Sequence, residues 1–292
     1  MSRSYFRGNL ARALYKRMLD EESLSNFDKS KWYSCDLSYL PDYVGEKFMQ
    51  LELDTGTEEF LENSLNKSEL MFIQLFHVLA RAFLSIFLTQ TSINGVLGRG
   101  SMFVFSSMQF EKLTGLAPLA LGERSLLDLG AGDGAVTDVM RPYFSRIDVT
   151  EVSWPMQRVL RSKGFSVVDV NSWADRKYDF ISVLNLLDRC EKPLTLLNDV
   201  KRSLKSRGGV IIALVWPFRP YVESGGIKNK PLENISLNNT SVEEQAKDLT
   251  RILEYLDFEV VRWSRVPYLC EGDFFQSYYW LTDILLYARL KY

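Results

Sequence analysis

From residue 125 onward, short apolar runs alternate with segments whose apolar residues recur every three or four positions. Short apolar runs predict strands and the longer period predicts helices, so the alternation favours a parallel sheet with crossover helices. We expect strands at residues 125–129, 147–150, 166–170, 180–184, 210–215, 259–265 and 278–286, and helices at 135–140, 155–163 and 193–204. After a long loop at 217–240, Ser241 is expected to cap a helix that reaches Leu256, with Glu244 completing a capping box.

The most apolar stretch of the chain covers residues 70–88 and is nearly long enough to cross a membrane. Gln74, His77, Arg81 and Ser85 recur in it at helical intervals, which gathers them along one stripe. An arginine near its middle would also be costly in hydrocarbon. We therefore interpret it as an amphipathic helix lying on the main domain, in preference to a membrane span or an interfacial helix, with His77 in a structural position on its polar edge.

The N-terminus reads as a basic amphipathic helix. No acid precedes Asp20, and the spacing leaves two interpretations open: an arm that packs on the protein or associates peripherally with a membrane, and an organelle presequence. The basic residues are Arg3, Arg7, Arg12, Lys16 and Arg17, and the apolar residues at every fourth position are Phe6, Leu10, Leu14 and Met18.

Composition and charge exclude several classes of protein. Hydrophobic residues make up 46% and charged residues 25% of the chain, as in ordinary globular proteins. Because 35 Lys and Arg balance 37 Asp and Glu, we expect no nucleic-acid partner. Cys35, Cys190 and Cys270 lie far apart, and His77 is the single histidine, so neither a disulfide framework nor a metal site is predicted.

The segment that points to chemistry is 126–134, with sequence LLDLGAGDG. An apolar strand enters a glycine-rich turn and then a helix, which suits a cofactor laid across the carboxyl end of the strand. Glu151 ends the second strand, where a carboxylate accepts hydrogen bonds from ribose hydroxyls. Asp128 and Asp133 disfavour a pyrophosphate and suit a cationic cofactor, so the turn resembles the S-adenosylmethionine site of class I methyltransferases.

Two further strand ends fit the same site. Asn171, Ser172 and Trp173 follow the third strand, where this class offers a polar group and an apolar wall to adenine. The segment 185–189 follows the fourth strand, beside the transferable methyl group. The full set of residues expected to hold the cofactor is Arg99, Ser101, Asp128, Gly130, Gly132, Asp133, Glu151, Val152, Asn171, Ser172, Trp173 and Asn185.

Six blocks in one order resemble the DREV family of protein-histidine methyltransferases. They are 91–95 (TSING), 98–105 (GRGSMFVF), 127–134 (LDLGAGDG), 184–190 (LNLLDRC), 217–223 (PFRPYVE) and 267–273 (PYLCEGD). The resemblance implies an α/β class I fold, Rossmann-like, with a seven-stranded sheet, an antiparallel last strand and an N-terminal helical extension. It divides the chain into a mainly helical region at 1–120, packed on the core, and a methyltransferase domain at 121–292.

The same resemblance implies transfer of a methyl group from S-adenosylmethionine, leaving S-adenosylhomocysteine, to the N-pros (N1, π) nitrogen of histidine in His-x-His segments of proteins. Asn185 and Asp188 match its catalytic positions. Asp188, Tyr268 and Tyr279 match positions that bind the substrate histidines. Arg189, Phe218 and Glu223 are also expected to bind substrate, but only because they lie in matching sequence blocks. Ser172 departs from the family, which commonly has glutamate there, and we expect this to weaken a cofactor contact without removing the site.

We propose from these positions that Asp188 accepts the hydrogen of one imidazole nitrogen and so leaves the other free to attack. The chain holds no His-x-His segment of its own, so the substrate must be another polypeptide.

Two other hypotheses stay open: a class I methyltransferase acting on RNA or a small molecule, and a cofactor-binding interaction module without catalysis. A monomer is favoured, and an intracellular location, at the endoplasmic reticulum or mitochondria, rests on the resemblance alone.

Overall fold

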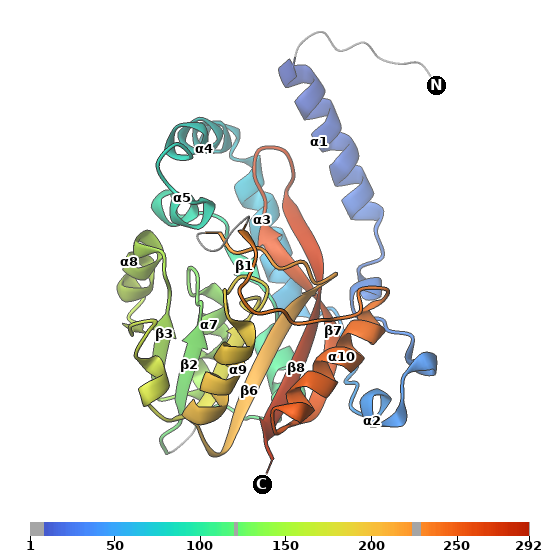
Figure 1. Ribbon diagram of the computed structural model, residues 1–292. Helices are drawn as coiled ribbons and strands as arrows, with labels where there is room; N and C mark the ends of the chain where they lie inside the picture. Colours follow the sequence, from blue (N-terminus) through green and yellow to red (C-terminus); the bar gives the residue numbers. More distant parts are fainter. Residues whose placement is uncertain (1–8, 120–121, 224–228, 292) are drawn as a thin grey trace.

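An eight-stranded sheet forms the centre of the computed structural model, which describes residues 9–119, 122–223 and 229–291 (Figure 1). The strands lie in the order β1-β7-β8-β6-β5-β2-β3-β4. Their bounds are β1 (Met102–Phe103), β2 (Ser125–Leu129), β3 (Arg146–Thr150), β4 (Ser166–Val167), β5 (Tyr178–Leu184), β6 (Leu204–Trp216), β7 (Phe258–Glu271) and β8 (Tyr278–Leu290). The strands from β4 to β6 pair in parallel, β8 runs antiparallel between β6 and β7, and each edge of the sheet is a strand of two residues.

This topology confirms the predicted class I methyltransferase fold with its antiparallel last strand. The sequence pattern predicts seven strands, and the eighth is β1, too short to have a period of its own. Several bounds also differ from the prediction: β4 ends at Val167, β6 already begins at Leu204, β7 continues to Glu271 and β8 continues to Leu290. The Ser241 hydroxyl accepts from the Glu244 amide as predicted, but the Glu244 carboxylate pairs with Lys247, so the reciprocal half of the capping box is not formed.

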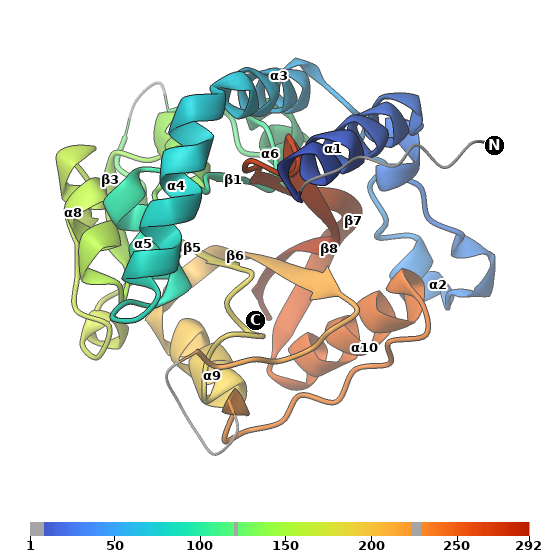
Figure 2. The same ribbon diagram turned by 90° about the horizontal axis from the view of Figure 1, so that it is seen from above.

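Helices cover both faces of the sheet (Figures 1 and 2). Alternate residues of one strand enter different cores, since side chains in a strand point to opposite faces. Leu127 joins the core beneath α9 and α10, whereas Leu126 joins the core with Phe110 and Phe180 on the other face. The helices are α1 (Asn9–Asn26), α2 (Asp42–Gly45), α3 (Thr55–Glu69), α4 (Met71–Leu84), α5 (Gln90–Leu97), α6 (Ser107–Thr114), α7 (Ala135–Met140), α8 (Trp154–Ser162), α9 (Pro193–Ser203) and α10 (Val242–Tyr255).

The N-terminal region packs directly on the sheet. The indole nitrogen of Trp263 on β7 donates to the Val44 carbonyl at 2.8 Å, and Met49 and Lys47 exchange backbone hydrogen bonds with the same strand. Phe105 from the N-terminal region is fully buried in the core that contains Phe180. Residues on either side of position 120 therefore share one hydrophobic core.

Helix α4 is amphipathic as the spacing predicts, but its orientation corrects the sequence interpretation. Gln74, from the polar stripe, is 6% exposed, whereas Phe72 is 90% exposed and Phe76 62%. The Gln74 end of the polar stripe therefore faces the protein, whereas Arg81 and Ser85 are exposed, and the apolar side faces solvent. His77 also lies toward the protein, with its Nδ1 atom buried and without a hydrogen-bond partner. Among the described residues, the helices are too short or too polar to cross a membrane.

Candidate active site

The glycine-rich turn between β2 and α7 leaves room beside the carboxyl end of the sheet. Gly130 and Gly132 both have positive φ angles, 73° and 57°, which glycine adopts without strain. A Cβ atom on Gly130 would meet the Leu186 side chain at 3.1 Å, whereas one on Gly132 would meet nothing within 4 Å. The turn is therefore held close to Leu186 on one side and opens into a cavity at Gly132.

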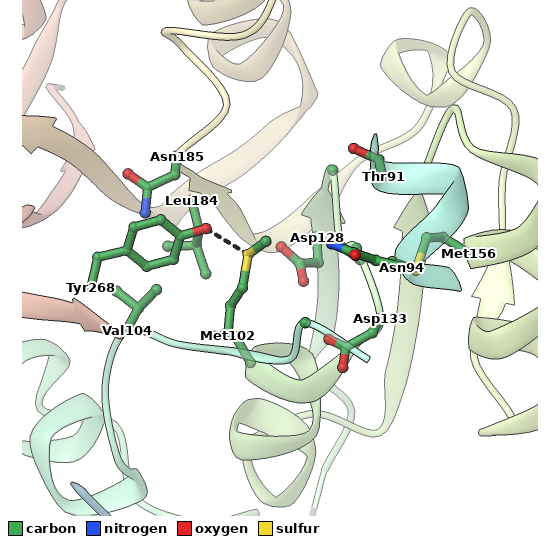
Figure 3. A pocket seen from close by; sticks show the side chains of 15 residues that line it. Thr91, Asn94, Met102, Val104, Asp128, Asp133, Met156, Leu184, Asn185 and Tyr268 are labelled. Carbon is green, nitrogen blue, oxygen red and sulfur yellow. Dashed lines mark hydrogen bonds between the residues drawn. The ribbon is translucent and has the colours of Figure 1, made fainter. Parts of the chain in front are cut away.

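The cavity at this edge joins elements from both parts of the chain (Figure 3). Of the predicted site residues, Asp128, Gly130, Gly132, Asp133, Asn185 and Tyr268 line it. The remaining lining residues were not predicted as site residues: Thr91, Asn94, Gly100, Met102, Val104, Ala131, Val136, Met156 and Leu184. Several of these residues lie within 91–105, a segment that contains three glycines. Those glycines were the sequence signal that the backbone of this segment approaches a ligand closely.

Asp128 is buried at the end of β2 and is hydrogen-bonded through both oxygens. The Thr137 hydroxyl donates to Oδ2 at 2.5 Å and the Ser182 hydroxyl donates to Oδ1 at 2.6 Å. Burial raises the pKa of Asp128 to about 6, although the two hydroxyl bonds act in the opposite direction. The carboxyl group thus fixes the start of the glycine turn while it lines the cavity.

Glu151 connects the end of β3 to the same turn. Its Oε2 accepts from the Gly132 amide at 3.1 Å, and its Oε1 accepts from the Ser153 amide at 2.8 Å. The side chain is buried, and burial raises its pKa despite these backbone donors. Glu151 does not line the cavity itself, but its carboxylate holds the glycine whose open side does.

An acidic cluster lies on the other side of the cavity. The Asn185 amide donates from Nδ2 to Oδ2 of Asp283 at 2.7 Å, and Asp188 pairs through Oδ2 with Arg189 at 3.1 Å. Burial raises the pKa of Asp188, and it raises the pKa of Asp283 to about 8. Asn185 Oδ1, Asp188 Oδ1 and Asp283 Oδ1 are all buried without a hydrogen-bond partner. Because Asp283 holds a proton up to about pH 8, the unpaired acceptors of the cluster are Asn185 Oδ1 and Asp188 Oδ1, and they call for a ligand that carries donors.

Asp283 is a site residue that sequence reasoning missed. It stands in β8 between Thr282 and a run of buried apolar residues, and it is fully buried. A charged residue inside an otherwise apolar strand was the signal, because such a group is costly to bury unless it is paired or functional. In the antiparallel register Asp283 lies opposite Val266 and Tyr268 opposite Leu281, which directs Asp283 and Tyr268 to the same face of the sheet.

Tyr268 lines the cavity, whereas Tyr279 stays at its margin. The Tyr268 hydroxyl lies against the Met102 sulfur, as Figure 3 shows, and burial raises its pKa well above the ordinary value. Tyr279 is 39% exposed and donates to Asp273 Oδ1 at 3.0 Å. The two tyrosines therefore lie at different depths on the same hairpin.

Arg99 and Ser101 hold the segment around Gly100 instead of lining the cavity. The Arg99 guanidinium donates to the Gly272 carbonyl at 3.1 Å, and the Ser101 amide donates to the Glu271 carboxylate at 3.3 Å. These bonds attach residues 99–101 to the end of β7. Gly100 between them reaches the cavity wall as a result.

The predicted adenine contacts at 171–173 are also placed away from the cavity lining. Trp173 is buried in the core beneath α9, while Asn171 and Ser172 are exposed. Val152 is 79% exposed beyond the end of β3. These side chains surround the carboxyl ends of the strands, but in the described conformation they do not touch the cavity.

Phe218 and Glu223 form hydrogen bonds with elements next to the cavity. The Phe218 amide donates to Asn239 and Gln245 at 2.8 and 2.9 Å, which fixes the chain after β6. The Glu223 carboxylate accepts from the Gln90 amide at 3.0 Å, at the start of α5. Because α5 contributes Thr91 and Asn94 to the cavity, Glu223 positions one wall of it.

Comparison with known proteins matches one family model to most of the chain. The DREV methyltransferase family model matches residues 32–289, which include both the glycine turn and the acidic cluster. Among solved structures, the chain is similar to a putative methyltransferase from Bacillus halodurans C-125, with 12% identity over 64% of this chain and 97% of that one and a TM-score of 0.42. It is also similar to magnesium protoporphyrin IX methyltransferase from Synechocystis PCC 6803, with 15% identity over 59% and 72% of the two chains and a TM-score of 0.39.

Proposed function

Because the chain belongs to the DREV methyltransferase family, we propose that it transfers the methyl group of S-adenosylmethionine to the N-pros (N1, π) nitrogen of histidine in His-x-His segments of protein substrates. The observation that supports the substrate class is the pair of buried acceptor atoms without partners, Asn185 Oδ1 and Asp188 Oδ1, beside Asp283. An imidazole brings the N–H donor that such a cluster lacks.

The residues at the glycine turn fit S-adenosylmethionine. Gly132 leaves open the space that a side chain would fill, and Asp128 lines that space beside it. Two carboxylates near the turn, Asp128 and Asp133, favour a cofactor with positive charge. We assign its binding to the glycine turn, Glu151 and Asn185. The cofactor supplies an already activated methyl group, so the protein needs to position the acceptor and exclude water.

Asp188 is suited to select the imidazole tautomer. Its Oδ2 is engaged by Arg189, and its Oδ1 is buried and free to accept. A histidine that donates one N–H to Oδ1 presents its other nitrogen without a proton, and only that form is nucleophilic. After transfer the ring is cationic, and the adjacent carboxylate stabilises it. Asp188 is therefore assigned as an orienting acceptor in contact with the substrate.

Tyr268 and Tyr279 are assigned to the substrate histidines. Tyr268 lies in the cavity near the acidic cluster, and Tyr279 is half-exposed on the neighbouring strand. Aromatic rings provide flat packing surfaces and their hydroxyls provide hydrogen bonds, so two tyrosines at different depths suit two rings separated by one residue. This arrangement supports a paired His-x-His segment as the substrate.

The decisive experiment is transfer of a labelled methyl group from S-adenosylmethionine to a short His-Ala-His peptide, with fragmentation mass spectrometry to place the methyl. We expect one N-pros-methylhistidine per segment and none in peptides with either histidine replaced by alanine. Cofactor binding without transfer to any such peptide would refute histidine as the acceptor while leaving the methyltransferase assignment intact.

A further inference from the structure

Helix α4 and the turn after it present a row of apolar side chains to solvent. Phe72, Phe76, Leu79, Phe83 and Phe87 recur at three- and four-residue intervals and are between 62% and 90% exposed. This spacing places them along one side of the helix, and we call the row the α4 ridge. A contiguous exposed apolar surface of this kind marks an interaction site more often than single exposed residues do.

The orientation of the helix shows that the ridge is not a misplaced core face. Gln74 on the opposite side is buried, and its amide donates to the Lys67 carbonyl at 2.9 Å. A helix that turns an amide inward and phenylalanines outward loses hydrophobic stabilisation unless something else covers the apolar side. None of the described residues covers the apolar side of α4.

Two other elements border the ridge at the same end of the molecule. Figures 1 and 2 show α1 and the turn between β7 and β8 at the end where α4 lies. Arg17 on α1 ties them together, since it donates to the Ser68 carbonyl just before α4 at 3.1 Å and to the Phe274 carbonyl in the turn at 3.3 Å. Phe275 in that turn is 50% exposed, so a second apolar side chain is exposed at this end of the molecule.

The charged residues on α4 and in the chain that follows it have one sign. Residues 70–110 contain no aspartate or glutamate, while Arg81 lies on α4 and Arg99 follows α5. The first part of α1, up to residue 19, is likewise basic and free of acids, and Asp20, Glu21 and Glu22 follow in its second half. Basic residues beside an apolar helix face are complementary to anionic lipid headgroups, which attract Lys and Arg near the membrane surface.

We propose that the α4 ridge is a membrane-docking surface that lies in the interface of a bilayer containing anionic phospholipid. At 14 residues, α4 is about 21 Å long, which is too short to span hydrocarbon of about 30 Å but suits a helix lying in the membrane plane. A row of exposed apolar side chains along one side of a helix also suits a fluid bilayer, which adapts to its shape. This inference is independent of the methyl acceptor.

Vesicle flotation of the full chain tests it. We expect the protein to float with vesicles of phosphatidylcholine and phosphatidylserine, and to float about tenfold less with phosphatidylcholine alone. The double variant Phe76→Glu/Phe83→Glu should lose flotation by about tenfold or more, because it places two charges on the inserted face. The matched control Leu232→Glu/Tyr255→Glu changes two side chains that are 64% and 87% exposed on other elements, and it should float like the parent protein.

Circular dichroism and thermal melting establish that both double variants are folded. Absence of flotation in the parent protein, or equal flotation of the ridge and control variants, would overturn the proposal. A parent protein that is dimeric by light scattering and becomes monomeric in the ridge variant, without binding vesicles, would also overturn it and assign the ridge to a contact between two copies of the chain.

Discussion

The side-chain amide of Asn185 donates a 2.7 Å hydrogen bond to the carboxyl group of Asp283, which joins the carboxyl end of β5 to β8. Asn185 has a positive φ of 51°, an uncommon conformation outside glycine, and its amide nitrogen has this one fixed acceptor. The bond therefore holds the Asn185 oxygen at the cavity, and Asp283 is a positioning residue for it.

Replacement of Asp283 by leucine should lower kcat/KM for a His-Ala-His peptide by about tenfold to a hundredfold, because an unpaired buried amide costs about 1 to 3 kcal/mol. Asp283→Asn keeps an oxygen that can accept from Asn185 and should retain most of the activity. Steady-state kinetics of both variants distinguish positioning from simple packing. Equal activity of the leucine and asparagine variants would contradict the role.

Asp283 should also make stability depend on pH. Burial raises its pKa from 3.8 to about 8, so between these values the folded protein binds more protons than the unfolded chain. The free energy of unfolding contributed by this group therefore falls as pH rises through that window. We expect Asp283→Asn to unfold in urea with a smaller decrease in stability from pH 5 to pH 8 than the parent, and identical pH dependence of the two proteins would disprove this linkage.

Asp188→Asn should reduce turnover by about a hundredfold or more, the usual contribution of a positioned acid or base, and leave cofactor affinity within a few-fold of the parent. The amide can still fill the space, but it does not stabilise the imidazolium product as a carboxylate does. Calorimetry with S-adenosylhomocysteine and single-turnover transfer measure the two effects separately. Asp199→Asn on the surface of α9 serves as the control, and unaltered turnover of Asp188→Asn would remove Asp188 from the mechanism.

Glu151→Ala should weaken binding of S-adenosylhomocysteine by about tenfold to a hundredfold, since it removes the acceptor of the Gly132 and Ser153 amides along with the predicted ribose contact. Glu151→Gln keeps an acceptor oxygen and should lose less affinity. Isothermal titration gives both values, and thermal melting shows whether the turn has loosened. Unchanged affinity in the alanine variant would show that Glu151 has no part in the cofactor site.

The sequence predicted the strands and the glycine turn because both depend on local patterns. Strands such as 125–129 are buried on both faces of the sheet, so their sequences are mostly apolar and can be recognised without knowing their neighbours. Gly130 and Gly132 are required by backbone angles that the turn itself imposes. The ends of the elements were predicted less accurately. β6 extends to Leu204 because Leu204 pairs with Tyr178, and the sequence around Leu204 does not show which strand it pairs with.

The acidic cluster and the orientation of α4 could not be read from local patterns. Asp283 meets Asn185 only because β8 inserts antiparallel between β6 and β7, and no spacing along the chain encodes that order. The polar stripe of α4 was visible in the sequence, but the periodicity of a helix does not say which side faces the protein. The position of Trp173 is likewise not encoded in a local pattern: its apolar ring suits a cofactor wall in the sequence, and in the fold it packs in the core.

Both edges of the sheet are strands of two residues, β1 and β4, although the strands inside it reach 14 residues. A long free edge exposes a row of backbone donors and acceptors that can recruit a strand from another chain. Here each edge strand has only two residues, so it exposes very few backbone donors and acceptors. The long apolar strands of the methyltransferase core are thereby kept from growing into intermolecular sheets, which protects a protein with so many buried β-residues against aggregation.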